Sequence, residues 1–529
     1  MRSTIPPYSA QAWVSMMTGK SPAKHGIVDF FQPVVRPSAG RDAGSPAKRD
    51  ASGVRHSFVS SARIQGEAIW DTLSRHGKRV GVVNVPLTYP PAQVNGYMVS
   101  GFMTPKGRQD YTYPAELRQE ILAVTGAYDP DPWDLLTPSQ SLPELAHWMD
   151  IAEQAARYLL ERHPVDFYVS VIQALDQLQH TLWDVIADES ARQGPRGAQL
   201  WPWVERCYQK MDAIIGQRLG LLDEDTTLFV VSDHGFQKVN SWFYVNRWLA
   251  DAGFLCFAED RRGRGGTVLA KLGLTRDGIK TLIQKVDVLG LRRYVGRFTR
   301  AAIADKLEDA LSPPIDWTRS VAYSGSRTSE GIFINLKGRE PQGIVEPGAA
   351  YEQVRERIMR ALSALVDPRT GERVVSAVYR REDVHNGEFL HLLPDVLFSL
   401  DDRPYLTSDS TTAMRAFAPL SRDDVRGRHH SHGVFAACGA GVVPGLELPE
   451  VAIVDVAPTI LYAMDLPIPA DMDGRVLEEA FTPEYRRSHP IRYEAPPAGA
   501  AREAGPEPVY SDEEDAEMQR RLRGLGYLG

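Results

Sequence analysis

The sequence TTLFVVSDHGF, residues 226–236, joins an apolar, β-branched run to an acid, an imidazole and a glycine. A nearly continuous apolar run of this length is typical of a strand that is buried on both faces. Segments with helical periodicity lie between such runs, as at 141–163 and 351–366. This alternation predicts an α/β layered fold. The other apolar runs of this kind lie at 78–91, 165–176, 331–338, 394–400 and 433–442.

The composition of the chain excludes several classes of protein. The 529 residues include 60 Lys+Arg and 68 Asp+Glu, which gives a formal net charge of −8 with both signs mixed along the chain. We therefore expect no binding to a nucleic-acid duplex. The three cysteines, Cys207, Cys256 and Cys438, have no CxxC spacing, which argues against a disulfide framework or a thiolate metal site.

The apolar runs are too short for a membrane helix, which needs about 18 residues or more. The first residues, MRSTIPPYSAQ, contain no apolar segment of the kind found in signal peptides. We therefore expect no membrane span and, for the chain as given, a cytoplasmic location.

The alternation of strands and helices is interrupted twice. A polar, Gly-rich entry, EDRRGRGG, leads into a basic helical segment, which predicts an insertion or cap, with a surface excursion as the alternative. Near the end, a Pro/Ala-rich linker leads into a charged helix that we expect to dock back on the core. The sequence thus predicts a discontinuous core at 1–254 and 314–485, a cap at 255–313, and a linker with a helical tail at 486–529.

Polar residues with metal-binding side chains gather near strand ends. Asp233 and His234 follow the run at 226–231, and Asp176 ends another run with His180 four residues later, one helical turn away. Taken alone, each pair is more often a structural cap or a satisfied polar pair than a metal site. At the carboxyl edge of one sheet, together with a histidine cluster, they favour a zinc-like divalent site. That cluster, GRHHSHGVF, offers His429, His430 and His432.

The N-terminal stretch YSAQAWVSMMTGKSPAKHGIVDF, residues 8–30, places Ser9 immediately before an expected helix. Backbone N–H groups and the helix dipole favour an anion there. Contact with a metal ion would lower the pKa of the Ser9 hydroxyl and make it a nucleophile. The alternative is that Ser9 only caps the helix.

Together these motifs resemble the type I phosphodiesterase and nucleotide pyrophosphatase family of the alkaline phosphatase superfamily, over nearly the whole chain. SAQAWVSMMTGKSPAKHGI is similar to the family's nucleophile helix, with Gly19 and His25 as markers, and SDHGF is the most specific motif. DVAPTILYAMDLPIPADMDGRVL and LRGLGYL resemble closing segments of the subgroup. The resemblance implies an alkaline phosphatase-like fold, with a mostly parallel central sheet, helices on both faces and an inserted cap.

The resemblance also implies roles for single residues. Ser9 would be the nucleophile, and the G-x-H pattern in GRHHSHGVF selects His429 from the three histidines. The implied ligands are Asp176, His180 and His429 for the first metal, and Asp233, His234 and Ser9 for the second. The expected cofactors are two divalent ions, zinc first and manganese as the alternative. The implied mechanism is in-line displacement at phosphorus through a phosphoryl-serine.

Two departures from the family pattern bear on function. In the family an Asp at the end of an earlier strand completes the second metal site, whereas only eight residues precede Ser9; we expect the upstream frame to encode a strand ending in Gly-x-Asp-Gly. Phe30 stands where animal nucleotide pyrophosphatases carry an Asn that contacts the phosphoryl group. We predict a phosphoric ester hydrolase for a small phosphorylated substrate, with diesters before monoesters. The alternatives are a phosphomutase or phosphomonoesterase of the same superfamily, or an inactive binding pseudoenzyme.

Overall fold

The structure is a computed structural model that describes residues 1–33, 56–132, 138–258, 313–325, 330–421, 424–496 and 509–525. Its α/β body contains a sheet with strand order β5-β4-β3-β6. β3 is parallel to both β4 and β6, and all of its residues are buried, as expected for a strand covered on both faces. These strands span Thr112–Tyr113 (β5), Gly96–Ser100 (β4), Val80–Val85 (β3) and Phe167–Ser170 (β6).

The mixed α/β class is confirmed, but the strands do not form one mostly parallel sheet. The described strands are divided among several sheets of two to four strands, and most of their pairs are antiparallel. One example is β7 (Thr227–Val231), the strand of the opening motif, which pairs antiparallel with β17 (Phe435–Gly439). Parallel pairing is found for β3 with its two neighbours and for two short pairs elsewhere.

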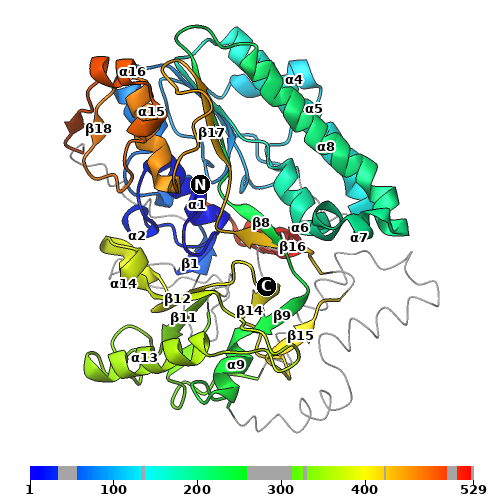
Figure 1. Cartoon of the computed structure of the whole chain (residues 1–529), viewed down its shortest axis with the longest axis vertical. Helices are drawn as coiled ribbons and strands as arrows, with labels where there is room; N and C mark the ends of the chain where they lie inside the picture. Colours follow the sequence, from blue (N-terminus) through cyan, green and yellow to red (C-terminus); the bar gives the residue numbers. More distant parts are fainter. Residues whose placement is uncertain are drawn as a thin grey trace.

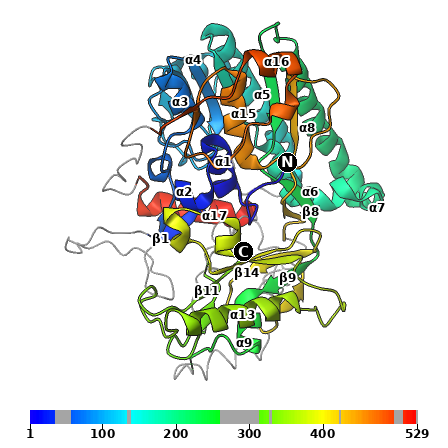
Figure 2. The same ribbon diagram turned by 60° about the vertical axis from the view of Figure 1, so that its left-hand side comes forward.

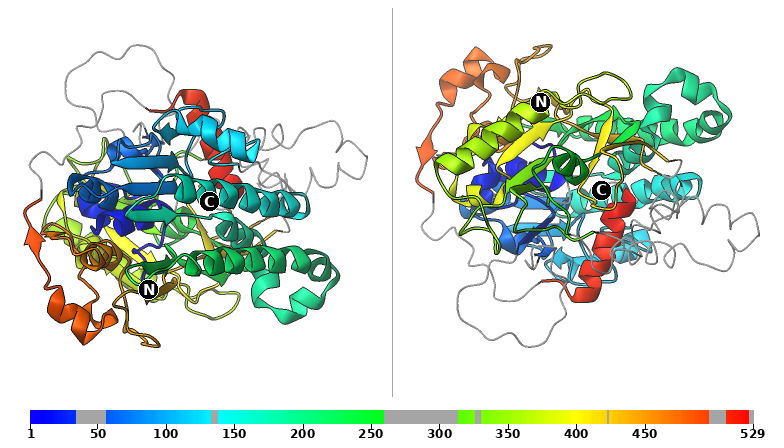
Figure 3. Two further views of the ribbon diagram at one scale, coloured as in Figure 1. Left: turned by 90° about the horizontal axis from the view of Figure 1, so that it is seen from above. Right: turned by 90° about the horizontal axis from the view of Figure 1, so that it is seen from below.

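Two groups of helices cover the α/β body. On one flank, α5 (Pro138–Arg162) and α8 (Pro195–Leu219) lie side by side (Figures 1 and 3). They enclose a small core with α6 (Ala174–Ala187), to which Met149, Leu178 and Val204 contribute. The second group is packed around α15 (Val456–Ala463), which contacts both α1 (Ser9–Thr18) and α3 (Ile69–Arg75).

A second lobe between residues 241 and 421 has its own hydrophobic core, drawn in the lower part of Figure 1. Its largest sheet has the order β10-β11-β13-β12 and is covered by α13 (Ala349–Ser363). These strands span Ala322–Tyr323 (β10), Gly331–Ile334 (β11), Val396–Ser399 (β13) and Ala377–Arg380 (β12). The expected cap at 255–313 lies, apart from its two ends, outside the described residues.

The charged terminal helix, α17 (Asp512–Leu525), packs against the α/β body at the level where the two lobes meet (Figure 2). Its Met518 and Leu522 are buried in the same core as β3 and β4. Among the helices of the described ranges, none has the length and apolar composition required to cross a bilayer.

Candidate metal centre

Asp176 and His180 both lie on α6, which follows the parallel strand β6 after a short connection. The spacing of four residues places both side chains on one face of the helix. Asp176 Oδ1 lies 3.7 Å from His180 Nε2, and the His180 side chain is fully buried. The carboxyl edge of the parallel strands therefore presents a carboxylate and an imidazole at one point, as the sequence predicted.

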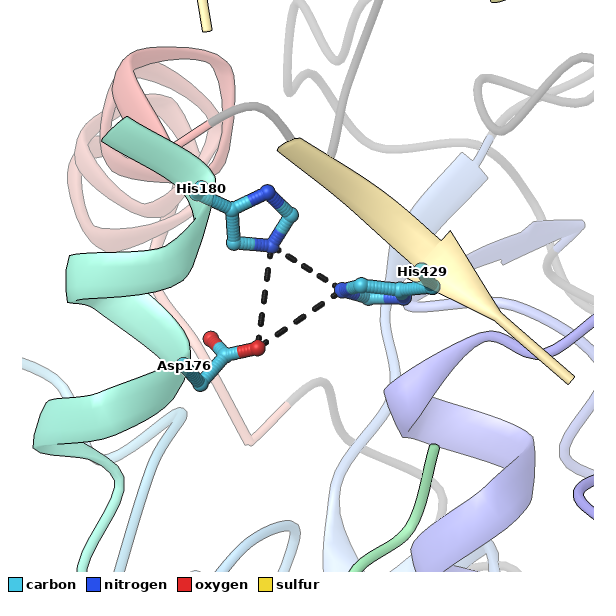
Figure 4. Close-up of side chains that lie close together, drawn as sticks. All are labelled: Asp176, His180 and His429. Atoms are coloured by element: carbon cyan, nitrogen blue, oxygen red, sulfur yellow. Dashed lines mark hydrogen bonds and ion pairs between the residues drawn. The ribbon is translucent and has the colours of Figure 1, made fainter. Parts of the chain in front are cut away.

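His429 reaches the same point from β16 (Gly427–His430), which pairs antiparallel with β8 (Gly235–Lys238). His429 Nε2 lies 2.9 Å from His180 Nε2 and 3.7 Å from Asp176 Oδ1. Figure 4 shows the three side chains pointing toward one another from the helix and the strand. The structure thus brings together the three residues that the family resemblance grouped as ligands of the first metal.

Hydrogen bonds to carbonyl groups determine which imidazole nitrogens face this group. His180 Nδ1 donates to the Gly427 carbonyl oxygen at 3.2 Å, and His429 Nδ1 donates to the Pro7 carbonyl oxygen at 3.0 Å. A carbonyl oxygen only accepts, so each Nδ1 carries the proton and each Nε2 directs its lone pair toward the group. Burial, followed by the neighbouring His234, lowers the pKa of His180 to about 3 and holds the pKa of His429 well below its usual value.

The donor set fits a divalent cation. Two imidazole lone pairs that face each other at 2.9 Å beside a carboxylate repel one another, and a cation at the centre reverses the sign of that interaction. For a triangle with sides of 2.9, 3.7 and 3.7 Å, the point equidistant from the three atoms lies about 2.0 Å from each, which matches zinc bond lengths. Imidazole with carboxylate and no thiolate suits zinc, with manganese as the more oxygen-seeking alternative.

The second predicted group, Asp233, His234 and Ser9, lies directly against the first. His234 Nε2 is 2.9 Å from Ser9 Oγ and 3.1 Å from Asp233 Oδ2. The same nitrogen lies 3.8 Å from Asp176 Oδ1, and the His234 ring stacks on His429 with centroids 3.5 Å apart. Although burial opposes it, the carboxylates of Asp233 and Asp176 raise the pKa of His234. The site therefore has a negative field that favours cations.

Ser9 is the first residue of α1, and Tyr8 is the N-cap. The sequence placed Ser9 just before the helix, so the observed helix begins one residue earlier than predicted. The Ser9 side chain is buried, and its hydroxyl points to His234. At the first position of a helix the local N–H groups have no intrahelical partner, and the dipole favours an anion there. The nucleophile expected from the sequence thus lies between a helix N-terminus and the carboxylate and imidazole group.

Comparison with known proteins identifies the family. Residues 1–434 match the family model described as type I phosphodiesterase / nucleotide pyrophosphatase. The chain belongs to this family. A search of curated proteins finds no significant match.

Solved structures similar to this family member include three enzymes. The phosphonoacetate hydrolase of Sinorhizobium meliloti, in complex with phosphonoacetate, is 15% identical, with 87% of this chain and 85% of that chain covered and a TM-score of 0.43. An inactive form of murine ectonucleotide pyrophosphatase/phosphodiesterase 5 in complex with AMP is 10% identical, with 91% and 90% covered and a TM-score of 0.42. Alkaline phosphatase PafA is 12% identical, with 90% of each chain covered and a TM-score of 0.40.

The remaining histidines of the family-like motifs lie away from the metal centre. His430 Nε2 lies 3.6 Å from Asp402 Oδ1, and His432 Nε2 lies 3.4 Å from Glu450 Oε1. His25 has the opposite arrangement of protons to the ligand histidines. The Ile27 N–H donates to His25 Nδ1 at 3.2 Å, so the proton is on Nε2, which lies 2.9 Å from Ser15 Oγ. We therefore assign His25 a structural role.

Position 235 requires a glycine because there is no room for a side chain, and the sequence did not reveal this. The φ of Gly235 is not among the positive values of the described glycines, so a left-handed turn does not explain the residue. A Cβ at this position would lie 2.0 Å from the His432 carbonyl oxygen. The strand β8 therefore passes too close to the β16 segment for any side chain at Gly235.

Sequence reasoning missed two kinds of contributor to the site. The carbonyl groups of Pro7 and Gly427 orient the ligand imidazoles, and a backbone group carries no sequence signal. A buried ion pair joins Arg428, beside His429, to Glu330 of the second lobe. The Glu330 N–H donates to the Tyr8 hydroxyl at 3.1 Å, next to Ser9. Arg428 lies within the GRHHSHGVF motif, where an arginine among histidines was the one available signal.

Proposed function

We propose that the chain is a metal-dependent phosphodiesterase that cleaves small phosphate diesters with Ser9 as the nucleophile. The observation that carries this proposal is the position of Ser9 Oγ, 2.9 Å from His234 Nε2 at the border of the Asp176, His180 and His429 group. A buried hydroxyl beside a set of carboxylate and imidazole donors is the arrangement that phosphoryl transfer requires. Membership of the type I phosphodiesterase family supports the same reaction class.

The chain's own residues supply most of the proposed mechanism. Divalent ions held by the two ligand groups would supply positive charge against the phosphoryl oxygens. His234 Nδ1 donates to the Gly235 carbonyl oxygen at 3.1 Å, so its Nε2 faces the second metal position and lies 2.9 Å from Ser9 Oγ. A divalent ion held there would lower the pKa of the Ser9 hydroxyl, so that its proton is lost to solvent. Ser9 Oγ attacks phosphorus as the alcohol or phenol oxygen leaves in line. The serine ester formed in this way keeps the second organic group of the diester. Water then hydrolyses it, releases the phosphate monoester and restores the Ser9 hydroxyl.

The proposed substrate is a small phosphodiester without a preference for nucleotides. Phe30 is buried and packs edge-on against Phe102 with ring centroids 5.8 Å apart. A phenyl ring offers no hydrogen bond to a phosphoryl oxygen, unlike the Asn of animal nucleotide pyrophosphatases. We therefore infer that the organic groups of the diester are bound by apolar contacts.

The test compares zinc-loaded and manganese-loaded protein on bis(p-nitrophenyl) phosphate and on p-nitrophenyl phosphate. We expect metal-dependent release of p-nitrophenol with the diester favoured. Ser9→Ala should lose turnover and retain bound metal, because it removes the attacking oxygen and no charged ligand. Ser15→Ala, on the same helix, is the matched control and should keep turnover. With bis(p-nitrophenyl) phosphate, a p-nitrophenyl phosphate group bound to Ser9 after acid quenching, detected by mass spectrometry, would identify the intermediate.

The same experiment separates the alternatives. Faster monoester than diester hydrolysis would indicate a phosphomonoesterase. Transfer of the phosphoryl group to a second position of the substrate without release of phosphate would indicate a mutase. Metal binding without turnover of either ester would favour a binding pseudoenzyme and would contradict the proposal.

A further inference from the structure

The terminal helix α17 is attached to the α/β body by polar contacts that are themselves buried. Arg521 Nη2 lies 2.7 Å from Asp131 Oδ1, and these side chains are 8% and 2% exposed. Tyr510, just before the helix, donates to the carbonyl oxygens of Val59 and Met103, each at 3.3 Å. A buried ion pair is favourable only when its hydrogen-bonding geometry is good. The attachment of α17 through Arg521 and Asp131 is therefore specific.

The partners of α17 belong to the segment that follows β4. The Met103 N–H donates to Asp131 Oδ2 at 3.0 Å, so the ion pair of Arg521 also fixes the loop after β4. Farther along this loop, Arg108 forms a bidentate pair with Glu514 of the helix, with distances of 2.6 and 3.1 Å. Glu514 of α17 and Tyr510, just before the helix, thus contact the loop at residues 101–111 directly. Arg521 of the helix reaches the same loop through Asp131.

This loop and α6 leave the sheet at the same edge. β4 and β6 are both parallel to β3, so the loop after β4 and the helix after β6 start from neighbouring carboxyl ends. Ligands of open α/β sheets bind at that edge. Residues of α17 contact α6, and Figure 4 shows α17 in red behind the helix that carries Asp176 and His180. On its other side, Phe102 of the loop packs on Phe30.

We propose that α17 is a built-in clamp of the active site, in which Arg521 is a positioning residue that holds the loop at 101–111 beside α6 as one wall of the substrate site. The inference rests on the proposed function, because the wall would contact an organic group of the phosphodiester. Arg521 acts through Asp131 and Met103 and does not itself touch the substrate.

The first measurement tests the clamp without turnover. Hydrogen exchange in Arg521→Ala should become faster in the loop at 101–111 and in α6. The matched control is Arg218→Ala, which removes a similarly enclosed ion pair with Glu153, 2.7 Å long, between α8 and α5. The control should leave both segments protected. Unchanged exchange in Arg521→Ala would overturn the proposal whatever the chain hydrolyses.

The second measurement tests the wall with two diesters that share a leaving group. The ratio of kcat/KM for bis(p-nitrophenyl) phosphate to that for methyl p-nitrophenyl phosphate reports on the second organic group alone. Arg521→Ala should lower this ratio about tenfold, mostly through KM for the larger diester, because a displaced wall loses contacts with that group. Arg218→Ala should leave the ratio unchanged, and Arg521→Lys should restore part of it.

Each negative result of these measurements leads to a different conclusion. An equal loss for both diesters, or an unchanged ratio, would make α17 a purely structural helix and overturn the wall. Absence of hydrolysis in the parent protein would reject the proposed function. The hydrogen-exchange measurement alone would then test whether α17 restrains the loop and α6. Should Arg521→Ala not fold, Tyr510→Phe removes only the hydrogen bonds to Val59 and Met103 and takes its place in both measurements.

Discussion

His25 should make the folded protein sensitive to acid while playing no part in metal binding. The side chain is fully buried between Ser15 and the Ile27 N–H. Burial, with additional effects of His385 and Lys20, lowers the pKa of His25 from 6.5 to about 3. Below pH 6.5 the unfolded chain therefore binds a proton at His25, whereas the folded chain leaves this imidazole unprotonated. The contribution of His25 to the free energy of unfolding is fully present above that pH and decreases as the pH falls.

The magnitude follows from the two pKa values. Between pH 7.5 and 5.5 the protonation of His25 in the unfolded chain lowers the free energy of unfolding by about 1.4 kcal/mol. The perturbation is His25→Gln, which keeps an amide near Ser15 and cannot titrate. Urea unfolding of both metal-free proteins at the two pH values gives four free energies of unfolding. The parent should lose about 1.4 kcal/mol more than the variant over this interval, because all other titrations cancel.

An equal pH dependence in the two proteins would refute the reasoning, since it would mean that His25 titrates normally in the folded state. The zinc stoichiometry of His25→Gln provides a second check. It should equal that of the parent, because the proton arrangement of His25 differs from that of the ligand histidines. Loss of zinc from this variant would contradict the structural role.

Three further predictions concern single sites. His429→Ala should lose zinc by equilibrium dialysis with an affinity reduced at least about a hundredfold, whereas the exposed His432→Ala should bind as the parent does. Arg428→Met leaves Glu330 buried without its partner and should lower the free energy of unfolding by about 3–5 kcal/mol; a change below about 1 kcal/mol would show that the pair is solvated. Gly235→Ala should lower Tm and zinc content together, since its Cβ would lie 2.0 Å from the His432 carbonyl oxygen; a neutral result would reject the close approach of β8 and β16.

Local patterns in the sequence predicted several elements and one pair of neighbouring site residues. The apolar run before Asp233 is β7, and the helix expected at 141–163 is α5, Pro138–Arg162. Asp176 and His180 could be paired from their spacing alone, because four residues make one turn of a helix. The charged tail helix that we expected to dock back does so as α17.

Long-range pairing could not be predicted in the same way. The antiparallel partner of β7 is β17, some 200 residues later, and nothing in either apolar run specifies the other. The separate core at residues 241–421 depends on such pairings as well. The tautomers of His180 and His429 depend on carbonyl groups supplied by Gly427 and Pro7, and a backbone group is identical at every position.

Anomalous diffraction from crystals of the zinc-loaded protein tests the central claim most directly. We predict one zinc peak about 2.0–2.3 Å from Asp176 Oδ1, His180 Nε2 and His429 Nε2, and a second peak about 4 Å away, in contact with Asp233, His234 and Ser9 Oγ. A protein that binds zinc only at surface histidines such as His432, or that shows no peak among these side chains, would contradict the account.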